Sequence, residues 1–125
     1  MNMIKIKKIT GSADTANTAS YVDGARFTAG VVAATTATFD YTSAAGAVKD
    51  LVFTVTGADT AEKLLNAQRC ADFFTLTLQQ VAGAGSSIHK GVFDLGNQAA
   101  ITAAAGLTFT DAATEPLVSV VLSVD

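Results

Sequence analysis

The sequence predicts a small α+β domain, rich in β-structure, with an antiparallel sheet or sandwich and one main α-helix near residues 59–80. Three observations predict it: short runs that alternate apolar and polar residues, one segment with apolar residues at helical spacing, and a length of 125 residues. Alternation is typical of half-buried strands, and a 3.6-residue period is typical of an amphipathic helix. The length suits one domain and allows a core without metals or disulfides. We expect residues 1–125 to form a single structural domain.

The first alternating runs predict one strand and one hairpin. Met3–Lys7 alternates isoleucine with lysine and predicts the first strand. Thr36–Thr42 and Asp50–Thr56 alternate on either side of the small-residue segment Ser43–Ala47. Two alternating runs around a glycine-containing loop are typical of a β-hairpin.

Shorter signals predict the connecting elements. We expect a turn at Tyr21–Gly24, a short strand at Arg26–Ala29 and another around Val92–Phe93. Leu107–Thr110 has the composition of a strand, whereas Asn97–Ala105 is a low-complexity segment with no assigned structure.

Leu117–Val124 carries the strongest strand signal. In an ideal strand its apolar residues divide into one face with Val118, Val120, Leu122 and Val124 and another with Leu117 and Val121. No charged residue lies between Glu115 and Asp125, although the solvent face of a half-exposed strand normally carries polar or charged side chains throughout. We therefore expect this strand to be central in its sheet or covered on both sides.

Residues 10–20 are small and polar and show no apolar periodicity, which predicts an extended arm or loop. Such a segment cannot form a core of its own, so we expect it to become ordered against a neighbouring subunit. Ala82–Ser87 is a second loop by composition.

The main helix is predicted by its start signal and by its periodicity. Asp59 and Glu62 form a variant of the capping box. Leu65 and Leu76 lie on a second side, so the helix is either covered on two sides or ends early. Phe74–Leu78 also alternates well enough for a strand, so we expect a helix through at least Phe74 and leave Thr75–Gln80 open between helix and strand. The periodic apolar residues are Leu64, Ala67, Ala71, Phe74, Leu78 and Val81.

The composition is poor in charge. Half of the residues are apolar and only 15% are charged, whereas about 25% is typical of soluble domains. One interpretation is that neighbouring subunits cover much of the surface; the other is that alanines are scattered over the surface of a monomer. We favour the first interpretation.

Charge and cysteine content restrict the partners and the compartment. The net charge is −3, and the only basic cluster is Lys5, Lys7 and Lys8, which argues against nucleic-acid binding. One cysteine allows no intrachain disulfide. The N-terminal residues lack the apolar run of a signal peptide, and no stretch approaches the roughly 20 apolar residues of a membrane span. We expect synthesis in a cytoplasm and no membrane contact.

No motif for catalysis is evident. His89 and Cys70 are the single histidine and cysteine, too few ligands for a zinc site. Ser86 and Ser87 lie near His89 but not in a nucleophile elbow, and the aspartates do not form a calcium loop. The sequence therefore predicts a protein that is not an enzyme, with no catalytic, cofactor-binding or metal-binding residues and no cofactor.

The order of these features resembles small virion structural proteins of tailed phages that infect marine bacteria. The similar features are the Met3–Ile6 strand, the polar arm, the hairpin around Ser43–Val48, the helix after Gly57 and the bias toward alanine, glycine and threonine. The resemblance implies a capsid decoration or cement protein, or a tail component, located in the virion. It also implies a homo-oligomer whose partners are other copies of itself, the major capsid protein, or both. No site residues follow, because such proteins act through shape and contact.

Two further classes remain as alternatives. A surface-layer or pilus-like subunit would require a secretion signal, which we do not find. A small ligand-binding α+β domain would place a few polar groups among aromatic side chains in a pocket. Tyr21, Arg26 and Tyr41 are the candidate residues for such a pocket.

Overall fold

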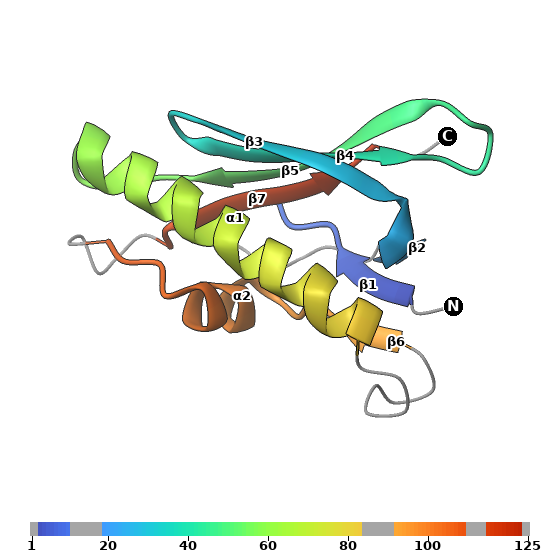
Figure 1. Ribbon diagram of the computed structural model, residues 1–125. Coiled ribbons are helices and arrows are strands. Elements are labelled where there is room, and N and C mark those ends of the chain that lie inside the picture. The colour runs from blue at the N-terminus through green and yellow to red at the C-terminus, as the bar shows by residue number, and fades with distance from the viewer. Residues whose placement is uncertain (1–2, 11–18, 84–91, 110–114, 124–125) are drawn as a thin grey trace.

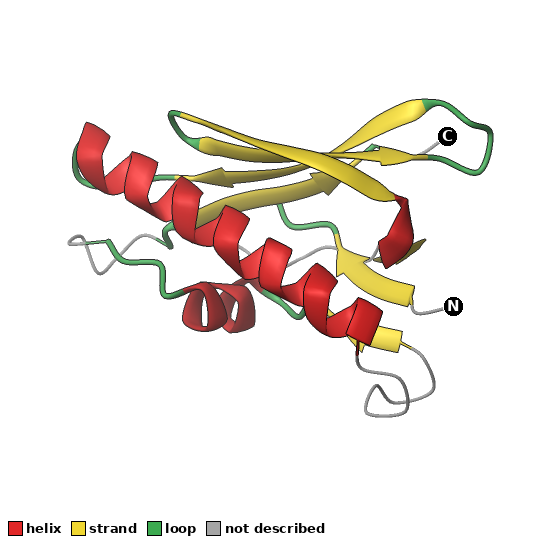
Figure 2. Cartoon of the chain, viewed as in Figure 1, coloured by secondary structure: helices red, strands yellow, loops and turns green. Residues whose placement is uncertain are grey.

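The computed structural model describes residues 3–10, 19–83, 92–109 and 115–123, and it confirms the predicted α+β class. The strands form a four-stranded antiparallel sheet and a three-stranded mixed sheet (Figures 1 and 2). The larger sheet has the order β3 (Phe27–Ala33), β4 (Thr36–Thr42), β5 (Val48–Val55) and β7 (Leu117–Leu122).

The smaller sheet is built around the first strand. Its order is β2 (Ala19–Asp23), β1 (Met3–Lys7) and β6 (Val92–Asp94), with β1 antiparallel to β2 and parallel to β6. A short 3₁₀ helix, η1 (Gly24–Arg26), leads from β2 into β3 and so joins the two sheets. The helices α1 (Thr60–Gly83) and α2 (Gln98–Ala105) lie on one side of the larger sheet (Figure 1).

The predicted hairpin is confirmed as β4 and β5. Phe39 pairs with Leu51 and Tyr41 with Lys49, and the apolar inward side chains of both strands are buried. The connecting turn is closed by the Ser43 N–H, which donates to the Ala47 carbonyl at 2.8 Å. Gly46 has a φ of +87°, in the left-handed region that favours glycine.

Helix α1 begins where the capping residues predict. The Asp59 carboxylate accepts from the Glu62 N–H at 2.8 Å, and the Glu62 carboxylate accepts from the Ala58 N–H at 2.7 Å. The ambiguous segment Thr75–Gln80 is helical. The buried Thr77 hydroxyl donates to the Phe73 carbonyl one turn earlier at 2.9 Å, so the polar group is satisfied within the helix.

Four aromatic rings fix α1 on the larger sheet. The Phe74 ring of α1 lies with its centroid 5.0 Å from that of Phe27, 4.7 Å from that of Phe39 and 5.5 Å from that of Phe53. These three rings come from β3, β4 and β5, and Phe53 and Phe74 are completely buried. The same core includes Ile4 and other apolar residues of β1, so both sheets and α1 share one hydrophobic core.

Two predicted assignments are wrong in the first half of the chain: the turn at Tyr21–Gly24 and the last residues of the arm at 10–20. Tyr21–Asp23 belongs to strand β2 rather than to a turn, because Val22 is buried opposite Ile4 of β1. Gly24 starts η1, and its φ is not positive. Most of the predicted arm at 10–20 lies outside the described residues, and its end, Ala19–Ser20, belongs to β2.

The low-complexity segment Asn97–Ala105 is largely a helix that the sequence analysis missed. The Asn97 side chain accepts from the Ala100 N–H at 2.8 Å, and Gly106 closes the helix with a φ of +71°. Alanine has the highest helix propensity, but Ile101 alone marks the buried side with a large apolar residue. After this helix, residues 107–109 form no strand, so the prediction for Leu107–Thr110 is wrong over its described part.

The last strand, β7, is present but differs from the prediction in two ways. A register shift between Thr54 and Val55 places both Leu117 and Val120 on the buried side, so strict alternation fails. β7 also lies at the end of its sheet rather than in its centre. Its outer edge is bridged at one position, where Ile9 and Val120 exchange backbone hydrogen bonds of 3.0 and 2.9 Å.

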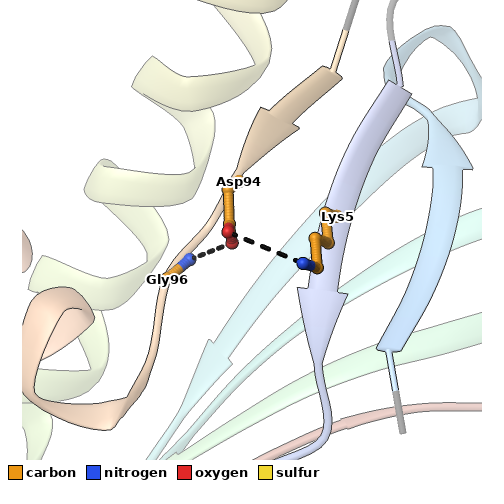
Figure 3. A network of polar contacts seen from close by, with 3 residues as sticks. All are labelled: Lys5, Asp94 and Gly96. Carbon is orange, nitrogen blue, oxygen red and sulfur yellow. Dashed lines mark hydrogen bonds and ion pairs between the residues drawn. The ribbon is translucent and has the colours of Figure 1, made fainter.

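Asp94 connects β6 to its neighbours. One carboxylate oxygen lies 3.9 Å from the Lys5 ammonium, and the other accepts from the Gly96 N–H at 2.9 Å (Figure 3). The Leu95 N–H also donates to the Lys5 carbonyl at 2.9 Å. These contacts join β6 to β1, the central strand of the smaller sheet.

Gly30 of β3 is packed under an aromatic ring, which generates a testable prediction. A Cβ built at this position would lie 2.6 Å from the Phe39 ring, and that ring is held by Phe53 and Phe74. We expect Gly30→Ala to lower the free energy of unfolding by about 1–3 kcal/mol, measured by urea denaturation, because the ring cannot move away cheaply.

The matched control is Gly30→Ala in a Phe39→Leu background. The smaller side chain removes the ring edge that the new methyl group would meet, so the added cost of Gly30→Ala should fall markedly. An equal cost in both backgrounds would contradict the packing explanation.

Candidate functional site

Of the two residues considered for nucleophilic chemistry, only Cys70 lies in the described part of the chain. Cys70 is 0% exposed in the core, and burial raises the pKa of its thiol to about 12. A neutral buried thiol is a poor nucleophile. His89 lies outside the described residues. Within the described ranges, no three histidine, cysteine, aspartate or glutamate side chains are close enough to hold a metal ion.

The predicted ligand-binding residues Tyr21, Arg26 and Tyr41 line one cavity. It has a volume of about 360 Å³ and lies between β2, η1 and the end of β4. Its wall also includes Met3, Val22 and Ala44. The volume falls within the roughly 300–1,000 Å³ that is usual for small-molecule sites.

Arg26 supplies the positive charge of this cavity. Its Nη1 donates to the carbonyl oxygens of Thr42 and Ser43, each at 3.2 Å. These two residues also line the cavity, so the guanidinium is held against its wall. Among the residues that the structure describes, no carboxylate forms an ion pair with Arg26. The charge is thus positioned by carbonyl dipoles alone.

The two tyrosines differ in their freedom. Tyr41 is buried, its hydroxyl donates to the Ser123 carbonyl, and its ring centroid lies 5.6 Å from that of Phe27. Tyr21 is 53% exposed, and the Lys5 ammonium lies 6.0 Å from its ring centroid. Tyr41 therefore forms a fixed wall, whereas Tyr21 stands at the opening.

A second candidate is the free edge of β3. β3 is the last strand of its sheet, and within the described ranges its other edge pairs with no strand. Residues Thr28–Val31 are exposed and include neither a charged residue nor a proline. Native edge strands usually carry such residues to prevent pairing with other chains. An unprotected edge is therefore suited to pairing with a strand of another chain.

The sheet face opposite α1, here called the outer face, continues from this edge. The register places Val31, Thr38, Val52 and Val121 in one row across four strands. The flanking residues of this face are mostly alanine, threonine and serine, and its charged members are Asp40 and Asp50. No described helix lies on this side of the sheet (Figure 1).

Helix α1 also presents apolar side chains to solvent. Leu64, Leu65 and Leu76 are 39%, 41% and 53% exposed. Neither alternative left open by the sequence holds among the described residues: the helix does not end early, and its second apolar side is left partly exposed. Single exposed leucines are ordinary, and Leu76 shares a surface hollow with the charged Arg69 and Asp72.

The outer face also contains an unfavourable charge pair. Asp40 and Asp50 are directly opposite in β4 and β5, and like charges at such positions destabilise a sheet. The pKa of Asp40 is raised above its ordinary value of 3.8, first by a side-chain hydrogen bond with Asp50, and then by desolvation and by repulsion from the same carboxylate. A proton shared by the two carboxyl groups would relieve this repulsion.

Comparison with protein-family models, curated proteins and solved structures found no match to this chain. In the described residues, no helix is long and apolar enough to cross a membrane. The candidate sites therefore depend on the geometry alone.

The burial of Cys70 predicts that it has a structural role only. We expect Cys70→Ala to cost about 1 kcal/mol of stability, because the volume change is small. The native thiol should react with a thiol-specific reagent only as fast as the protein unfolds, measured by the release of the coloured leaving group with and without urea. Rapid labelling of the native protein would show that the thiol is accessible and reactive.

The Asp40–Asp50 pair predicts a pH effect with a definite sign. Because the folded pKa of Asp40 is raised above 3.8, its contribution to stability is complete below that pH and is lost as the pH rises through the folded pKa. We expect Asp50→Asn to raise the melting temperature at neutral pH more than at acidic pH. A change in melting temperature that is independent of pH would contradict the coupling between the two carboxyl groups. Asp59→Asn, which removes a capping carboxylate on α1, serves as the control for charge removal.

Proposed function

We propose that this chain is a structural subunit that binds neighbouring subunits through the free edge of β3 and the adjoining outer face. The observation that carries the proposal is the edge itself, which is seven residues long and includes no charged residue or proline. Backbone groups at such an edge gain hydrogen bonds only from solvent or from another strand. A neighbouring strand would satisfy them, and the rest of the neighbouring subunit could then pack on the outer face, whose charged residues are Asp40 and Asp50.

The outer face supports the same role. Val31 is 64% exposed at the edge, and the row that it begins runs through Thr38 and Val52 to Val121. Threonine, valine and alanine side chains carry no charge, so burying them costs less desolvation than burying charged side chains. Side-chain contacts across such a surface resemble the packing of two sheets face to face.

The specific form of the proposal is a virion structural protein, most simply a capsid decoration or cement protein. Such a subunit would bind the major capsid protein, other copies of itself, or both, at the junctions of a shell. The support is the resemblance in the order of strand, polar arm, hairpin and helix, together with the neutral, unprotected surface. Asp40 and Asp50 would add a contact that depends on protonation or on a basic group of the partner.

Val31→Lys tests the edge directly. A lysine here places a charge beside the unpaired backbone groups, the device that natural edge strands use against pairing. We expect the wild-type chain to associate in light scattering, and we expect Val31→Lys to weaken that association about tenfold or more, because an unpaired charge would be buried at the contact. Val31 is exposed in the monomer, so the circular dichroism spectrum of Val31→Lys should match that of the wild type.

Ala103→Lys is the matched control. Ala103 is exposed on α2, on the side of the larger sheet opposite the outer face. It should leave association unchanged. Electron microscopy and mass spectrometry of particles from the source would test the virion role separately. A monodisperse wild-type monomer at high concentration that is also absent from such particles would overturn the proposal.

A further inference from the structure

The cavity formed by Tyr21, Arg26 and Tyr41 has no part in the proposed assembly contact. It lies at the junction of the two sheets, where η1 leads from β2 into β3. We propose that it binds a small molecule that combines an aromatic or other flat apolar group with a single carboxylate. This is a binding activity beyond the structural role.

Arg26 determines the charge of the ligand. One terminal nitrogen of its guanidinium is engaged by the Thr42 and Ser43 carbonyl oxygens, which fixes the orientation of the planar group. An arginine side chain carries five N–H donors in a rigid fork, so donors remain for a ligand. A carboxylate matches that fork with two parallel hydrogen bonds, and charge-assisted bonds of this kind are strong.

Asp23 makes the cavity a poor site for a ligand held by charge alone. It lines the same cavity, and one of its carboxylate oxygens accepts from the Ala25 N–H at 3.0 Å, which holds the carboxylate near η1. Its negative charge opposes that of Arg26, so an anion gains little from Coulomb attraction by itself. The ligand must therefore combine a carboxylate that matches the guanidinium fork with an apolar body, which inorganic phosphate lacks.

The remaining wall determines the body of the ligand. Tyr41 is buried and presents a fixed aromatic surface, and Met3, Val22 and Ala44 complete an apolar wall. Tyr21 stands half-exposed at the opening, where its ring can cover a flat ligand. Apolar walls with a few convergent polar groups are the usual construction of small-molecule sites.

Benzoate is a probe of this chemistry, followed by NMR of the backbone amides of the full chain. We expect saturable shifts at residues 20–26 and 41–44 in a titration up to about 10 mM, because a small probe of this size binds weakly. Benzamide, which has the ring but no charge, should bind at least about tenfold more weakly than benzoate. Inorganic phosphate should also bind at least about tenfold more weakly. The absence of saturable shifts, or equal binding of benzamide or phosphate, would overturn the proposal.

Three variants complete the test. Arg26→Gln should weaken benzoate binding about tenfold or more, because the charge-assisted bonds are lost. Arg69→Gln is the matched control, because Arg69 also donates to a backbone carbonyl, that of Gly106, but lies away from the cavity. It should bind as the wild type does.

Ala44→Trp keeps Arg26 and fills the opening, so it decides the matter if Arg26→Gln disturbs the turn that Arg26 supports. Ala44 is exposed in the β4–β5 connection, and a large side chain there should abolish the shifts. Unchanged benzoate binding in Ala44→Trp, or in a folded Arg26→Gln, would overturn the proposal.

Discussion

The packing of the Phe74 ring against three rings of the larger sheet is the interaction on which the rest of the structure depends. It joins α1 to β3, β4 and β5 at one point, and those strands are connected in sequence by short turns. Burial of aromatic rings contributes a large apolar area together with a preferred relative orientation. Gly30 belongs to this arrangement, because a Cβ at this position would lie 2.6 Å from the Phe39 ring.

A consequence of this packing is that the sheet is covered on one side only. Both helices and the small sheet lie with the aromatic cluster, and the row from Val31 to Val121 is left on the opposite side. Few charged residues lie on this uncovered face, which is the face where a neighbouring subunit could bind. On the other side of the molecule, α1 exposes three leucines on a helix that also carries charged residues.

The cavity follows from the crossing between the two sheets. β2 and β3 are consecutive in the chain but belong to different sheets, and η1 makes the change of direction. The end of β4 faces this corner, so Tyr41 and the carbonyl groups of Thr42 and Ser43 meet Arg26 there. The crossing from β2 through η1 to β3 thus leaves a cavity lined by Arg26 and two tyrosines.

The sequence by itself determined the local elements. The β4–β5 hairpin and the start of α1 follow from alternation and from the Asp59–Glu62 cap, which depend on residues close together in the chain. It also indicated Tyr21, Arg26 and Tyr41 as a possible set, from their residue types. Only the tertiary structure decided that Leu117 and Val120 share a side, that β7 lies at a sheet end and that these three residues line one cavity. Register, strand order and cavities depend on pairing between distant segments, and the periodicity of one segment contains no information about its partner.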